Sequence, residues 1–283
     1  TTAVDVYNLK MDKSSNGLVL SGNDLYIQNA GTFTSGIITS SATDQLIFKD
    51  NATVNSASNS SYVEGPITKI GDDAFVFPTG KSGNYQEIQI SAPSASTDVF
   101  NAEYFQSSAE VAFGTTYAAP IDHASNCEYW SLTQTTGSSA TTVTLTWDAN
   151  SCGVTNQNDL VVSKWDGTQW LNMGNSATTG NSTAGTISAG STTSNYGNFT
   201  LASITGGNPL PVEMFDYEVV RLGENAQLSW NTASERNKTV FQLYKTSDGI
   251  HFENLGSIEG KGNNQLLNNY SFLDENTMKG WNY

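Results

Sequence analysis

Short runs of alternating apolar and polar residues fill most of the chain. Segments such as "EIQIS", "TVTLTW" and "DLVVSKW" place an apolar side chain at every second position. This period of two is typical of half-buried β-strands, and turn-forming residues separate the runs at intervals of about 8–12 residues. No amphipathic pattern longer than a turn or two indicates a helix. The pattern therefore predicts an all-β protein.

The first segment, residues 1–59, carries apolar pairs between small polar residues. Such spacing predicts a short β-solenoid, in which small strands stack as rungs around a narrow core. The period is imperfect, so a flat β-meander is the alternative. Either structure would need support from a neighbouring segment, because each rung contacts only the next one. The apolar positions are Leu18, Leu20, Leu25, Ile27, Phe33, Ile37, Ile38, Leu46, Phe48 and Val54.

The second segment, residues 60–206, contains enough predicted strands for a two-sheet β-sandwich. Four tryptophans fall at or near strand positions, and we expect most of them to pack in the core, with stacking on sugars as the alternative. The run "WDGTQW" predicts a tight hairpin with Asp166 and Gly167 at its turn. The tryptophans are Trp130, Trp147, Trp165 and Trp170.

The third segment, residues 207–283, follows a linker that is rich in glycine and proline, "GGNPLP". Its strands alternate cleanly, and "TSDGIHF" predicts a hairpin with Asp248 and Gly249 at the tip. We expect an immunoglobulin-like or fibronectin-like β-sandwich with Trp230 as its core aromatic. The last residues, "WNY", predict the start of a further strand, so this sandwich is expected to lack its last strand or strands.

Charged residues make up only 14% of the chain, with 12 basic against 27 acidic residues and a net charge of −15. This balance argues against binding to nucleic acid or to an anionic membrane surface, since both require clustered Lys and Arg. No apolar run approaches the ~18–20 residues of a membrane helix, so we expect no membrane insertion. The acidity fits a protein that must stay soluble outside the cell.

The two cysteines, Cys127 and Cys152, flank a predicted pair of strands. In an exported protein this arrangement predicts a disulfide, which would stabilise the fold by about 3 kcal/mol in the loop-entropy model. Buried free thiols are the alternative. No Cys or His cluster accompanies the pair, so a metal site is not expected there.

Residues suited to catalysis lack companions in the sequence. His123 and His251 lie in different segments, and we expect both at the surface or in turns. Asp72 and Asp73 are neighbours, and neighbours on a strand point to opposite faces, so a turn is their predicted place. No catalytic site and no cofactor are therefore expected, and the protein is predicted not to be an enzyme.

The run "DANSCGVTNQND" is rich in oxygen ligands. It lacks the ordered spacing of a helix–loop–helix calcium site, so a hydrogen-bonded surface loop is the prediction and calcium the lesser alternative. No metal site is predicted. The residues concerned are Asp148, Asn150, Asn156, Asn158 and Asp159.

The pieces "LPVE", "LSWNTASE", "YSFLDEN" and "KGWNY" occur in this order from Leu210 onward. Together they resemble the fibronectin/immunoglobulin-like module of Bacteroidetes surface proteins, which precedes a type IX secretion sorting domain. The resemblance implies an extracellular structural or adhesive protein of the cell surface, with other copies, other surface proteins or glycans as partners. A carbohydrate-binding accessory module of a secreted polysaccharide-degrading enzyme is the alternative.

The family continues after "NY" with further strands and the sorting domain, and this sequence does not. Three explanations stay open: processing of a longer precursor, a disordered remainder, or a remainder outside the sequence in hand. A sharper hypothesis is that another subunit supplies the strand, as in donor-strand assembly. Joined head to tail in this way, copies would form a filament.

Overall fold

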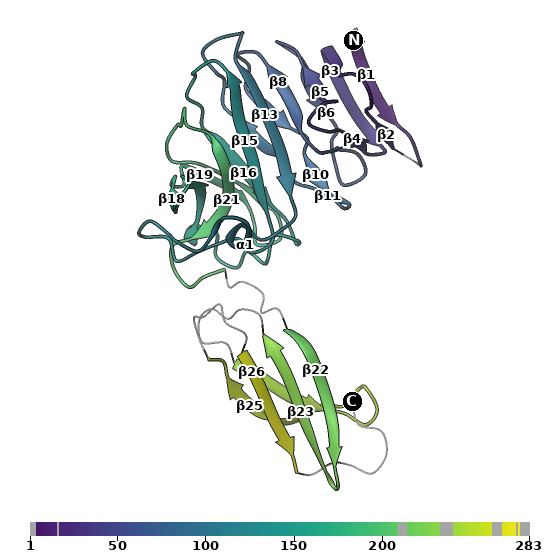
Figure 1. The fold of residues 1–283 in the computed structure, drawn as a ribbon, viewed down its shortest axis with the longest axis vertical. Helices are drawn as coiled ribbons and strands as arrows, with labels where there is room; N and C mark the ends of the chain where they lie inside the picture. The colour runs from purple at the N-terminus through teal and green to yellow at the C-terminus, as the bar shows by residue number, and fades with distance from the viewer. Residues whose placement is uncertain are drawn as a thin grey trace. The chain divides into compact units, whose positions relative to one another are not determined.

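The computed structural model describes residues 4–15, 17–208, 214–232, 240–261, 268–275 and 277. The chain divides into two compact units, Thr1–Asn208 and Pro209–Tyr283, which are described separately. Nearly all of the regular structure is β-strand (Figure 1). The predicted all-β class is therefore confirmed.

The first unit begins as a β-solenoid. Its register pairs Val4 with Leu25, Leu25 with Leu46 and Leu46 with Ile67, so each rung starts 21 residues after the previous one. Parallel pairing of this kind distinguishes a solenoid from a meander, whose neighbouring strands are antiparallel. The strands that pair in this way are β1 (Val4–Asp12), β3 (Leu25–Ser35), β5 (Leu46–Phe48) and β8 (Ile67–Ile70).

A second, smaller parallel sheet closes the other side of the rungs. It consists of β2 (Leu18–Val19), β4 (Ile38–Thr39) and β7 (Val63–Glu64). Apolar side chains of both sheets point into one core, where Ile27, Ile38 and Phe48 are fully buried. The extra strand β6 (Thr53–Asn55) pairs with β3 beyond the end of β5.

The larger sheet continues without a break into a β-sandwich. Beyond β8 its strands are antiparallel, in the order β13 (Val99–Phe105), β15 (Tyr129–Thr136), β21 (Gly197–Ser203), β17 (Leu160–Trp165) and β18 (Trp170–Asn172), with β14 (His123–Ala124) paired to β21. The facing sheet has the order β19 (Ala177–Gly180), β20 (Gly185–Ser188), β16 (Val143–Trp147), β12 (Ile88–Ile90) and β9 (Phe75–Phe77). The short elements are β10 (Gly80–Lys81), β11 (Asn84–Tyr85), α1 (Ala109–Phe113) and the 3₁₀ turn η1 (Gln157–Asp159).

The predicted segments 1–59 and 60–206 share this sheet and one hydrophobic core, within the single unit that ends at Asn208. A rung leaves a row of unpaired backbone groups at its edge, and the next strand of the chain pairs with them. Strand β8 forms this junction, because it pairs in parallel with β5 and antiparallel with β13. The boundary expected at residue 59 therefore divides neither the sheet nor the core.

The tryptophans of the sandwich lie largely in its core. Trp130 and Trp170 are fully buried, Trp147 is 1% exposed, and Trp165 is half-buried. Each buried indole N–H of this sandwich has a carbonyl acceptor: Trp130 donates to Gln86 at 3.1 Å, Trp147 to Asn181 at 2.9 Å and Trp170 to Gly114 at 3.0 Å. The predicted hairpin is present, with Trp165 paired to Trp170 and Gly167 at a φ of 104°.

The second unit packs the sheet β22 (Met214–Leu222), β23 (Asn225–Thr232) and β26 (Asn268–Asp274) against the pair β24 (Val240–Lys245) and β25 (Glu253–Glu259). Trp230 and Tyr270 are buried and stack with ring centroids 5.4 Å apart, and both rings contact Phe241. Trp230 is therefore the core aromatic of this unit. The expected strand at "WNY" lies outside the described residues. No helix of the described residues is long and apolar enough to cross a membrane.

Candidate functional site

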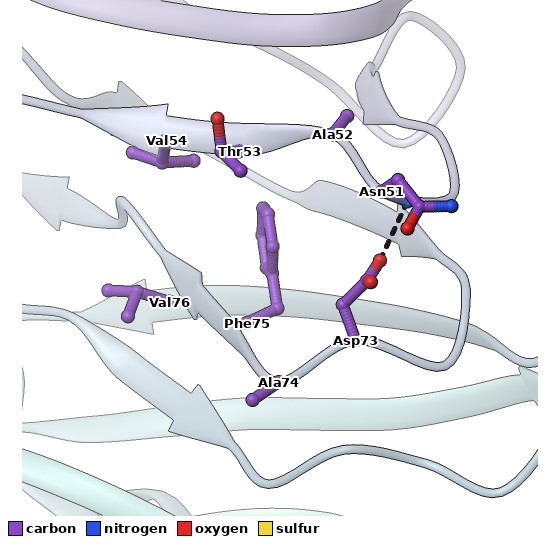
Figure 2. Close-up of a pocket in the computed structure, with 8 residues that line it drawn as sticks. All are labelled: Asn51, Ala52, Thr53, Val54, Asp73, Ala74, Phe75 and Val76. Atoms are coloured by element: carbon purple, nitrogen blue, oxygen red, sulfur yellow. Dashed lines mark hydrogen bonds between the residues drawn. The ribbon is translucent and has the colours of Figure 1, made fainter.

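A pocket of about 230 Å³ opens between β6 and β9, where the solenoid meets the sandwich (Figure 2). Strand β6 belongs to the larger sheet and β9 is the edge strand of the facing sheet, so the pocket lies at the open margin between the two layers. Figure 2 shows the ring of Phe75 between the two strands, with the polar groups of Asn51 and Asp73 at one end. The lining residues are Asn51, Ala52, Thr53, Val54, Asp73, Ala74, Phe75 and Val76.

A fully buried ammonium group holds the polar end of this pocket. The Nζ of Lys69 donates to Asp73 Oδ2 at 2.8 Å and to the carbonyls of Lys49 at 2.8 Å and Ala52 at 3.3 Å. The backbone N–H of Asn51 donates to the same Asp73 oxygen at 2.7 Å (Figure 2). Burial alone would raise the pKa of Asp73, but these hydrogen bonds outweigh it and leave the pKa below its usual value.

The solenoid register places Lys69 in this position. Ile27 pairs with Phe48 and Phe48 with Lys69, so the lysine occupies the inward position of the last rung. Its side chain passes 5.1 Å from the centre of the Phe75 ring and reaches the loop that follows β5. In the sequence Lys69 is the one charged residue of the run "ITKI", and its position in this strand pattern was the only local sign of its burial.

Three carboxylates gather beside this lysine. One oxygen from each of Asp50, Asp72 and Asp73 lies within 4.8 Å of the others. Residues 71–73 form a bend between β8 and β9, which agrees with the turn predicted for Asp72 and Asp73, and this bend lets the neighbouring carboxylates lie on one side. Oxygen ligands at this spacing suit a hard cation. Lys69 already places one positive charge beside Asp73, so the three carboxylates attract a metal ion less strongly than they would without the lysine.

Cys127 and Cys152 form a disulfide, with their Cα atoms 5.7 Å apart. It joins the start of β15 to the loop after β16. The residue next to Cys127 is Glu128, which is fully buried and was not recognised in the sequence. Burial raises the pKa of Glu128 to about 8, although hydrogen bonds with Ser151 and Tyr104 oppose the shift. No sequence pattern marked it, because Ser151 and Tyr104 are distant in the chain.

The two histidines differ in environment. His251 is exposed in the β24–β25 hairpin, as predicted, with its Nδ1 2.6 Å from Asp248. The prediction for His123 was wrong, because its strand β14 pairs with β21 and the ring is 3% exposed. Its Nδ1 lies 2.9 Å from Asp122 Oδ2 and its Nε2 lies 2.9 Å from the carbonyl oxygen of Asn208. The contact of Nε2 with the Asn208 carbonyl ties the chain at the end of the first unit to β14.

Several polar side chains of the oxygen-rich loop at residues 148–159 accept hydrogen bonds from backbone N–H groups of the same loop. Asp148 accepts the backbone N–H of Asn150 at 2.7 Å, and Asn156 accepts that of Asn158 at 3.2 Å. These are the self-capping turns that Asp and Asn side chains favour. Asn150 is exposed and also donates to Asn84 at 2.8 Å. Most of the loop is thus the hydrogen-bonded surface turn that was predicted, and Asp159 is the exception.

Several strand edges are open. Strand β1 pairs only with β3, and β24 only with β25, among the strands that the structure describes. Edge strands expose unpaired N–H and C=O groups, which can accept a further strand. On β22, at the edge of its sheet, Tyr217 is 82% and Val219 66% exposed.

The described residues thus offer two kinds of binding feature, a small polar-and-aromatic pocket and open strand edges. Comparisons with protein-family models, with curated proteins and with solved structures found no match for this chain. Its function therefore has to be inferred from its own residues.

Proposed function

We propose that this chain is a non-enzymatic structural or adhesive β-protein of the cell surface, exported by the type IX route that its second unit suggests. The observation that carries the proposal is the open edge of β1. This strand has nine residues, and one whole side of it is without a partner in the described structure. Such an edge presents backbone N–H and C=O groups with which a further strand can pair.

The sheet that β1 ends is a template for further strands. The rung spacing of 21 residues brings backbone groups into regular parallel register from β8 back to β1. The second unit carries the exposed edge strand β22, whose Tyr217 and Val219 project into solvent. In the proposed contact, an edge strand of the second unit in one copy pairs with β1 of the next copy. This contact is head-to-tail, and its repetition gives a filament.

Electron microscopy and light scattering of the purified chain test this proposal. Filaments or concentration-dependent oligomers are expected. Tyr7 is 70% exposed and has no paired residue on β3, because the register passes from Val6–Ile27 to Asn8–Ala30. Tyr7→Pro removes a backbone donor from the strand without removing a registered pair, so it should abolish assembly.

Tyr7→Ser is the matched control, because it removes the ring but keeps the N–H. Assembly that survives Tyr7→Ser and fails in Tyr7→Pro supports backbone pairing at β1. A chain that stays monomeric at all concentrations, or that assembles equally well with Tyr7→Pro, overturns the end-to-end proposal.

A carbohydrate-binding role is the second candidate, and the pocket of Figure 2 favours it. The pocket offers the carboxylate of Asp73, the amide of Asn51 and the hydroxyl of Thr53, which can form hydrogen bonds with the hydroxyls of a sugar, while the Phe75 ring at its floor is 4% exposed and belongs to the core. Calorimetry with oligosaccharides should then detect binding that Asn51→Ala weakens and that Thr34→Ala, on the exposed part of β3, leaves unchanged.

A further inference from the structure

The outer face of the larger sheet carries a row of polar side chains across three neighbouring strands, which Figure 1 shows side by side. Glu103 on β13 pairs with Ser131 on β15, and Ser131 pairs with Asn198 on β21; these three residues are called the outer row. The adjacent positions on the three strands are the core residues Tyr104, Trp130 and Phe199. Successive side chains of a strand point to opposite faces, so the outer row points away from the core.

The fold does not use the polar groups of the outer row. All three side chains are half-buried, and none forms a hydrogen bond or an ion pair with another described residue. The neighbouring row on the same face is different, because Asn101 donates from Nδ2 to Gln45 Oε1 at 2.8 Å and to Thr68 Oγ1 at 2.9 Å. The outer row thus gathers a carboxylate, a hydroxyl and an amide that are free to bind a ligand.

Four half-buried rings form an aromatic border beside this row. Tyr129 lies on the outward side of β15, and Phe105 of β13 stacks on it with ring centroids 4.6 Å apart. Phe113 of α1 lies 5.0 Å from Tyr129 and 6.1 Å from Trp165, which ends β17. The border covers the buried ring of Trp170 on its inner side. The indole N–H of Trp165 has no acceptor among the described residues and is not buried, so this ring also offers a free donor.

Rings beside free polar groups suit a saccharide, because a sugar has apolar C–H faces and hydroxyls that both donate and accept hydrogen bonds. Neighbouring strands lie about 4.8 Å apart, so the outer row spreads its three polar groups along a line across the sheet. A line of this kind fits a chain of sugar units better than a single one. We propose that the outer row and the aromatic border bind a neutral polysaccharide.

The charges at this surface favour a neutral ligand. No Lys or Arg belongs to the outer row or the aromatic border, and the chain carries a net charge of −15, so an anionic polymer would be repelled. Burial raises the pKa of Glu103, and the positive charge of Lys81 opposes the shift. Lys81 itself forms an ion pair with Glu64 at 3.7 Å.

Binding at this surface uses side chains and not backbone pairing. Strand β15 already pairs with β13 on one side and with β21 on the other, so it has no open edge for a further strand. This distinguishes the surface from the edge of β1, where assembly is proposed. The surface also shares no residue with the pocket of Figure 2. The proposal rests on the carbohydrate-binding candidate above and moves the ligand to a different part of the first unit.

Affinity electrophoresis of the full chain tests the surface, in gels that contain hydroxyethylcellulose, arabinoxylan, galactomannan or soluble starch, with alginate as the anionic comparison. At least one neutral polysaccharide should retard the chain, and alginate should not. Trp165→Ala should weaken binding about 10-fold or more, because a large ring is lost from the contact. Asn198→Ala should weaken it about 3–10-fold and should keep the fold, because the amide has no partner within the chain.

Trp165→Phe separates the ring from its N–H. It should retain most of the affinity but lose the change in tryptophan fluorescence that the polysaccharide causes in the unaltered chain. A purely structural role of Trp165 would not produce this split. Thermal unfolding of each variant shows that it is folded.

Thr135→Ala, at the exposed far end of β15, is the control and should bind as the unaltered chain does. Asn51→Ala alters the pocket of Figure 2 and should also leave this binding unchanged. Retardation that Asn51→Ala abolishes and Trp165→Ala does not would place the ligand in the pocket and overturn the inference, while the carbohydrate-binding candidate would stand. Failure of every neutral polysaccharide to retard the chain, or retardation by alginate alone, overturns it as well.

Discussion

The hydroxyl of Tyr104 donates a hydrogen bond of 3.0 Å to the buried carboxyl group of Glu128. The other carboxyl oxygen of Glu128 has no partner among the described residues. The pair lies directly beside the disulfide, because Glu128 follows Cys127 in the chain. Burial raises the pKa of Tyr104 as well, so both groups favour their neutral forms in the folded protein.

Glu128 should make the stability of the first unit depend on pH. Burial raises its folded pKa to about 8 from an ordinary value of 4.5. Stability is then highest below pH 4.5, falls as the pH rises from 4.5 to 8 because only the unfolded state releases the proton, and is constant above that range. Glu128→Gln should remove this dependence and raise the free energy of unfolding at pH 7 by about 1–3 kcal/mol.

Denaturant titrations at pH 5, 7 and 9 measure the effect. Glu253→Gln changes an exposed carboxylate and should leave the pH dependence of the first unit unaltered. If the free energy of unfolding of Glu128→Gln still falls as steeply with pH, groups other than Glu128 cause the pH dependence.

The disulfide should be a major source of stability. Cys127 and Cys152 are separated by 25 residues, and crosslinking a loop of that length contributes about 3 kcal/mol in the loop-entropy model. The double change Cys127→Ser and Cys152→Ser should lower the free energy of unfolding by this amount. After reduction, the unaltered chain should unfold at the same denaturant midpoint as the double variant. A denaturant midpoint that reduction does not change would contradict the prediction.

The Lys69–Asp73 ion pair should respond unequally to loss of its two members. Asp73→Asn leaves a fully buried ammonium without its counter-charge and should cost about 2–3 kcal/mol. Lys69→Met leaves Asp73, whose side chain is 30% exposed and can be hydrated, so a smaller cost of about 1 kcal/mol is expected. Chemical unfolding of both variants and of the double variant measures the coupling, and equal costs would contradict the asymmetry.

Gly31 should be required for rung stacking. A Cβ at this position would lie 2.7 Å from the Cζ of Phe48, a ring that is fully buried on the neighbouring strand. Gly31→Ala should therefore lower the free energy of unfolding by about 1–3 kcal/mol through overpacking. Thr34→Ala, at an exposed position of the same strand, is the control and should change stability by less than about 0.5 kcal/mol.

The sequence alone determined the class of structure and many local features. Alternation of apolar and polar residues is a property of each strand, so it predicted the strands "TVTLTW" and "DLVVSKW" before any partner was known. Asp-Gly pairs fixed the two hairpins for the same local reason, since glycine accepts a positive φ. Burial of Trp130, Trp147 and Trp230 followed from the size and apolar surface of the side chain.

The tertiary structure decided which residues meet. The 21-residue register puts Lys69 in line with Ile27 and Phe48, and the bend after β8 brings Asp50 to Asp72 and Asp73. The pairing of β14 with β21 buries His123, and the return of the chain at Gly207 encloses Asp159. These contacts join residues that lie far apart in the sequence. Their electrostatic consequences depend on distance and burial, which no local pattern of residues encodes.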